Sequence, residues 1–214
     1  MMFNFRSLVL VLVAAFINAY AQIYEPIEEA SAGYLINLAN KDAGEGDDLL
    51  KLKAVLVKNY DQKELESGYG VSQADFEILK NHFYEYEAAI KNISEDSALV
   101  LFNQWYLHLS NTFYEYSRKR FFSTEKEKII FFSASLSCQC TLELCKKQTI
   151  ETLNLVRTKN LVYWIVDSYQ HNDLQIEYET FFAPSLILFS ALNVVRLKME
   201  YEENLLFKLN QFLN

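Results

Sequence analysis

Glycine and proline are scarce in this chain, which has only 5 glycines and 2 prolines among 214 residues. Glycine-rich phosphate loops and glycine-paced β-repeats need more glycine than this, so the count argues against both. Long regular helices contain little of either residue. The count therefore favours helices for much of the chain. Aromatic side chains reach 15%, which predicts a large core rich in rings.

The first 21 residues have the pattern of a secretory signal peptide. Arg6 supplies a positive start, residues 7–17 form an apolar run, and residues 19–21 give a small-x-small cleavage site. The apolar run is too short to span a bilayer, which needs about 20 residues. No later segment is apolar over 18 uninterrupted residues. We therefore expect an exported protein, periplasmic or secreted, with no transmembrane segment in the mature chain.

Hydrophobic periodicity divides the mature chain into two parts. Over residues 22–122 the apolar side chains recur at helical spacing. The clearest stripe follows a Ser72 cap and consists of Phe76, Leu79, Phe83, Tyr86 and Ile90. Similar stripes predict further helices over 26–40, from Asp47 or Asp48 to about residues 67–70, and over 96–121. Short links between them indicate a small antiparallel bundle, and this part resembles no family.

Residues 123–214 alternate short β-rich runs with helical stretches. Strands are predicted over 128–134, 161–166, 185–189 and 194–199, and helices over 141–157, 172–178 and 201–213. The order β-α-β-α-β-β-α, placed after the helical region, predicts an α+β protein. The alternative is an all-α protein, because Pro184 can open a long helix through 185–213.

This order and two local segments resemble the thioredoxin fold, and the resemblance covers residues 126–214. Residues 132–140 read Phe-Ser-Ala-Ser-Leu-Ser-Cys-Gln-Cys, which is similar to the active-site entry of tryparedoxin-like and periplasmic thioredoxin-like proteins. There a strand of the type F-S-A-S or F-W-A-S leads into W-C-x-x-C and a helix. Residues 181–189, Phe-Phe-Ala-Pro-Ser-Leu-Ile-Leu-Phe, resemble the family's cis-proline segment. The resemblance implies that Ala183 and Pro184 shape a substrate site beside the cysteines.

The cysteine motif departs from the family's C-x-x-C. An ungapped match places Ser137 at the attacking position and Cys140 at the resolving position, whereas a shift by one places Cys138 and Thr141 there. Serine is no substitute for a nucleophilic thiol, because an unactivated hydroxyl ionises far less. Three interpretations stay open: a redox pair of Cys138 and Cys140, a structural disulfide that includes Cys145, or three inert thiols.

We therefore predict an exported thioredoxin-like protein that exchanges protein thiols and disulfides through a non-standard Ser-Cys-Gln-Cys site, without a cofactor. The alternatives are a redox-inactive thioredoxin-like module or an all-helical secreted module, each of which binds proteins. No metal site is predicted, because the three cysteines lack a fourth ligand and His82 and His108 lack an i, i+4 partner. The net charge of −8 argues against a nucleic-acid partner, since phosphate binding needs clustered Lys and Arg.

Overall fold

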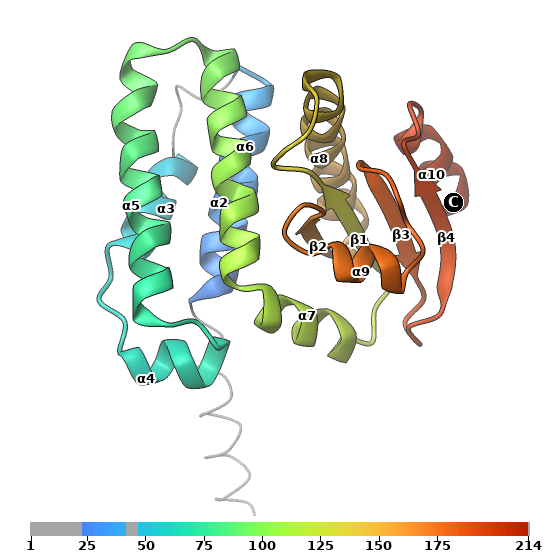
Figure 1. Ribbon diagram of the computed structural model, residues 1–214, viewed down its shortest axis with the longest axis horizontal. Coiled ribbons are helices and arrows are strands. Elements are labelled where there is room, and N and C mark those ends of the chain that lie inside the picture. Colours follow the sequence, from blue (N-terminus) through green and yellow to red (C-terminus); the bar gives the residue numbers. More distant parts are fainter. Residues whose placement is uncertain (1–22, 42–46, 214) are drawn as a thin grey trace, which may run out of the picture.

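The computed structural model describes residues 23–41 and 47–213. The predicted signal peptide lies outside these residues, so it stays a prediction, as does export. The described chain begins with helices and continues with a four-stranded mixed sheet (Figure 1). The protein is therefore α+β, and the all-α alternative is wrong because residues 185–189 pair as a strand.

The first part is helical throughout. It comprises α2 (Tyr24–Ala39), α3 (Asp47–Leu56), α4 (Gln62–Glu64) with the π-helical turn η2 (Leu65–Tyr69), α5 (Gln73–Ala89), the 3-10 turn η3 (Ile90–Asn92), α6 (Glu95–Thr112) and α7 (Tyr114–Ser123). Serine hydroxyls cap two of the long helices. Ser72 Oγ accepts from the Asp75 N–H at 3.1 Å, and Ser94 Oγ accepts from the Ser97 N–H at 3.3 Å. These contacts satisfy N–H groups that have no partner within the first turn.

Two predicted helices are shorter than their apolar stripes. The helix predicted over 96–121 breaks at Phe113, where φ is −102° and ψ is 24°, and α7 continues in a new direction. The helix predicted to run from Asp47 or Asp48 to about residues 67–70 ends at Leu56. Asp61 then caps α4, its side chain accepting from the Lys63 N–H at 2.7 Å. Periodicity missed both breaks, because the apolar spacing continues across them.

The second part forms a sheet with strand order β2-β1-β3-β4. The elements are β1 (Lys128–Ser133), α8 (Gln139–Lys159), β2 (Val162–Asp167), α9 (Asn172–Glu177), β3 (Ser185–Phe189), β4 (Val195–Glu200) and α10 (Leu205–Leu213). Strands β1 and β2 are parallel, while β3 is antiparallel to both β1 and β4. The predicted order β-α-β-α-β-β-α is confirmed. Strands β1 and β2 are parallel, and their last residues, Ser133 and Asp167, are paired. The loops that follow the two strands therefore leave the sheet at the same end.

Both faces of the sheet are covered. Ile129 and Phe131 belong to a large core cluster that also contains α2, α8 and α10 side chains. Ile130 and Phe132 point to the other face, in a cluster with side chains of α7 and α9. The large cluster runs from the first helices to α10 and so crosses the predicted boundary between residues 122 and 123. Helices and sheet therefore share one core.

Helix α6 packs along β2, the edge strand of the sheet. The Ser110 hydroxyl of α6 donates to the Ile165 carbonyl of β2, and the hydroxyls of Tyr106 and Tyr163 lie 3.2 Å apart. The helical part thus shields a strand edge that would otherwise be open to pairing with another chain. No helix among the described residues combines the length and apolar character needed to cross a bilayer.

Candidate thiol site

The cysteine pair lies at the N-terminus of α8, directly after the loop that follows β1. Cys138 is the N-cap residue, with extended backbone, and Gln139 is the first helical residue. The sulfur atoms of Cys138 and Cys140 lie 2.8 Å apart, and the Thr141 hydroxyl lies 3.2 Å from Cys138 Sγ. Both thiols are free and exposed. Cys138, rather than Ser137, therefore stands at the helix start, where the helix dipole favours a negative charge.

The surroundings of Cys138 favour its thiolate. Hydrogen bonding from the Cys140 thiol, followed by that from the Thr141 hydroxyl, lowers the pKa of Cys138 from 9.0 to about 7. At pH 7 about half of Cys138 is then ionised, against about 1% of a thiol with the ordinary value. Because the thiolate is the nucleophile in disulfide exchange, Cys138 is the most reactive thiol that this arrangement offers.

We expect the iodoacetamide reactivity of Cys138 to titrate near pH 7. A lowered pKa favours the deprotonated form, so the rate should rise about tenfold per pH unit below pH 7 and level off above it. Alkylation localised by tandem mass spectrometry measures this. The Cys140→Ala variant loses the main hydrogen-bond donor and should move the midpoint upward. A native midpoint near 9 would contradict the expectation.

Cys145 does not join the pair. The disulfide considered for this residue is absent, and Cys145 is a free thiol buried completely in the core. It follows Cys140 by five residues, which turns it about 140° around the helix axis. Burial raises the pKa of Cys145 to about 11. Cys145 is therefore an unreactive packing residue in this structure.

A cavity of about 290 Å³ opens beside the cysteine pair. We call it the cysteine cavity; the loop before α8, the loop after β2 and residues 181–183 line it. Ser137 and Thr141, which flank the cysteines, share this lining with Ala183. The Ala183–Pro184 peptide bond is cis, and Pro184 is buried, its carbonyl accepting from the Tyr201 N–H at 2.8 Å. The structure thus brings the two predicted segments together, although they are more than forty residues apart in sequence.

Large exposed apolar and aromatic side chains line the cysteine cavity. Of the sixteen large apolar side chains that are exposed in the described part of the chain, five line this one cavity. We call them the apolar collar: Leu136, Tyr169, Phe181, Phe182 and Tyr201. The sequence analysis did not identify these residues as a site, because they come from four separate segments. Phe181 and Phe182 were the only visible signal, since they adjoin the predicted proline segment.

A buried carboxylate ties two walls of the cysteine cavity together. Asp167, the last residue of β2, accepts from the backbone N–H groups of Ser135 and Tyr169 through Oδ1, each at 3.1 Å. Its Oδ2 lies 3.4 Å from the side-chain nitrogen of Asn111 on α6. Asp167 is completely buried. It therefore links the loop before the cysteines, the loop after β2 and the helical part.

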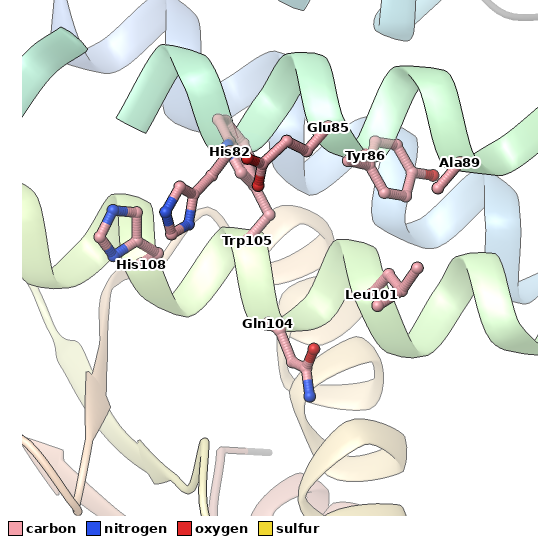
Figure 2. A pocket seen from close by; sticks show the side chains of 8 residues that line it. All are labelled: His82, Glu85, Tyr86, Ala89, Leu101, Gln104, Trp105 and His108. Atoms are coloured by element: carbon pink, nitrogen blue, oxygen red, sulfur yellow. The ribbon is translucent and has the colours of Figure 1, made fainter. Parts of the chain in front are cut away.

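A second cavity, of about 360 Å³, lies between α5 and α6 (Figure 2). His82 and His108 stand side by side at one end of it, with ring centroids 4.8 Å apart and ring planes 19° apart. Burial, followed by the neighbouring His82, lowers the pKa of His108, which keeps His108 neutral at pH 7. Nearly parallel rings do not direct their lone pairs at one ion. The two cavities share no lining residue.

Comparisons with protein families and with curated protein sequences found no match. No protein-family model matches the chain, and no curated protein sequence matches it. Among the residues that the structure describes, no group of three or more His, Cys, Asp or Glu is arranged to hold a metal ion.

Proposed function

We propose that this protein is a thiol–disulfide oxidoreductase with a thioredoxin-like domain over residues 123–214, and that Cys138 is its attacking thiol. The observation that carries the proposal is the exposed Cys138–Cys140 pair at the start of α8, 2.8 Å between sulfurs, beside a cavity lined by Ala183. The strand order and the position of Pro184 before β3 support the domain assignment. The signal-peptide pattern of residues 1–21 suits work in an oxidising compartment.

Cys138 and Cys140 together can reduce one substrate disulfide in two exchange steps. The Cys138 thiolate attacks one sulfur of a protein disulfide, so that a mixed disulfide forms and the other sulfur leaves as a thiolate that takes a proton from solvent. Cys140 Sγ, already in contact with Cys138 Sγ, loses its proton and attacks the Cys138 sulfur. The second substrate thiol is released, and Cys138 and Cys140 are left as a disulfide. Two electrons pass to the substrate, and an external dithiol returns them for the next turnover.

The alternative is a redox-inactive module of the same fold that only binds proteins. The departure from C-x-x-C favours it, because a C-x-C disulfide closes a smaller ring than the family's own. The lowered pKa of Cys138 favours chemistry instead, since a purely structural cysteine gains nothing from being ionised and exposed. The two proposals differ in whether Cys138 takes part in repeated cycles of disulfide exchange.

Insulin reduction with dithiothreitol as the electron donor separates these proposals. We expect the wild-type protein to accelerate the reaction at least tenfold over dithiothreitol alone. Cys138→Ser should abolish the acceleration, because no nucleophile is left. Cys140→Ser should still form the mixed disulfide but turn over slowly, because the resolving thiol is missing. Cys145→Ala is the matched control and should behave as wild type. A wild-type protein that does not accelerate insulin reduction is not an oxidoreductase.

A further inference from the structure

The apolar collar points to the class of substrate that Cys138 serves. Phe181 and Phe182 expose 71% and 62% of their surface. Exposed apolar side chains that gather around one cavity mark a binding surface rather than scattered surface residues. Because the collar adjoins a reactive thiol, its occupant must bring a sulfur to Cys138 while covering these rings.

The absence of charged side chains from the cavity lining restricts the class of substrate further. Among the residues that the structure describes, no Asp, Glu, Lys, Arg or His lines the cysteine cavity, whose polar lining side chains belong to Ser, Thr, Gln and Tyr. The whole chain carries a net charge of −8, which repels anions at long range. A cationic group to pair with a substrate carboxylate is therefore missing from the lining. Small anionic disulfides, glutathione among them, find nothing here to hold them.

We propose that the cysteine cavity takes disulfides of polypeptide segments whose residues next to the cysteine are aromatic or aliphatic and uncharged. The neighbours of the substrate cysteine cover Phe181 and Phe182, while the sulfur meets Cys138 at the N-terminus of α8. Such apolar stretches around a cysteine are exposed in unfolded chains and buried in native ones. This inference rests on the proposed thiol–disulfide exchange and adds the substrate class to it.

Three short peptides test the preference. Each carries a central cysteine as its mixed disulfide with 2-nitro-5-thiobenzoate, flanked on both sides by phenylalanine, serine or glutamate. Attack of Cys138 on the peptide sulfur forms the protein–peptide disulfide and releases nitrothiobenzoate, which is followed by absorbance. Each rate is divided by the rate at which the amino acid cysteine releases nitrothiobenzoate from the same peptide. This ratio removes differences in the intrinsic reactivity of the three peptide disulfides.

We expect the phenylalanine peptide to react about tenfold faster than the serine peptide, and the glutamate peptide to react most slowly. Tenfold corresponds to about 1.4 kcal/mol, which is less than the contribution of fully burying one aromatic ring. The double variant Phe181→Ser/Phe182→Ser should lose the preference for phenylalanine, so that its normalised rates with the phenylalanine and serine peptides become similar. The matched control is Phe207→Ser, because Phe207 is 65% exposed on α10 and does not line the cavity.

The outcomes distinguish this inference from the function on which it rests. If the wild-type protein releases nitrothiobenzoate from none of the peptides faster than Cys138→Ser does, the proposed exchange function fails and the inference fails with it. If all three peptides react at similar normalised rates, the exchange function stands and the substrate class is wrong. If the double variant keeps the tenfold preference, the preference does not come from the collar and the inference is overturned.

Discussion

Replacing Asp167 with alanine is expected to destabilise the protein by about 3–6 kcal/mol, because two partly buried hydrogen bonds to a charged acceptor are lost at about 1.5–3 kcal/mol each. Removal of the carboxylate takes away the acceptor of the Ser135 and Tyr169 N–H groups, which both donate to Asp167 Oδ1. Urea denaturation followed by circular dichroism measures the loss. A change below 1 kcal/mol would show that these N–H groups find other partners.

Asp167→Asn is the matched control. Its amide oxygen still accepts from both N–H groups, and its amide nitrogen can donate to Asn111 Oδ1, a buried atom with no partner in the described part of the chain. We expect this variant to lose about 1 kcal/mol. Where Asp167→Ala still folds, exchange with the phenylalanine peptide should slow, because the collar loops are released. The midpoint of Cys138 alkylation should stay near pH 7, since Cys140 and Thr141, which lower its pKa, lie on α8.

Arg120→Ala is the second change with a large expected effect, about 3–5 kcal/mol of destabilisation. Arg120 on α7 forms two hydrogen bonds to Glu28 on α2, at 2.8 and 3.1 Å, and its guanidinium lies 5.0 Å from the centre of the Tyr24 ring. Burial is the largest single influence and opposes the charge on Arg120, but the attractions of Glu28, Tyr24 and Glu25 and the hydrogen bonds to Glu28 together outweigh it and raise the pKa of Arg120. Truncation would leave the buried Glu28 carboxylate without its cation.

Two further variants sharpen this prediction. Arg118→Ala removes an ion pair with Glu177 that is exposed and 3.6 Å long, so it should change the free energy of unfolding by at most about 1 kcal/mol. The double variant Arg120→Met/Glu28→Leu removes both charges and should be more stable than Arg120→Ala, because it leaves no Glu28 carboxylate buried without its cation. If Arg120→Ala and Arg118→Ala cost the same, the pair with Glu28 does not hold α7 against α2.

Local pattern predicted most of the secondary structure. The stripe from Phe76 to Ile90 follows the helical period, and runs such as Leu186-Ile187-Leu188 suit a strand buried on both faces. These signals depend on neighbours within a few residues, so they can be read without the fold. The Ser72 cap is also a local signal. Cys138 and Cys140 are close in space because they are two positions apart in the sequence. The local sequence therefore led to the cysteines and to the order of the elements.

The tertiary structure alone decided how these pieces make a site. Helix α7 changes direction at Phe113 because its rings, Tyr114 and Phe121, pack against the sheet. The helical spacing of apolar residues over 96–121 does not indicate this packing. In the sequence, nothing distinguishes Asp167 from other residues at strand ends. The parallel pairing of β1 and β2 places it next to the loop before the cysteines. Leu136 and Tyr201 meet at one cavity, although they are far apart in sequence. Composition, periodicity and motif each act over short stretches of chain, whereas a binding surface depends on long-range packing, which no single segment encodes.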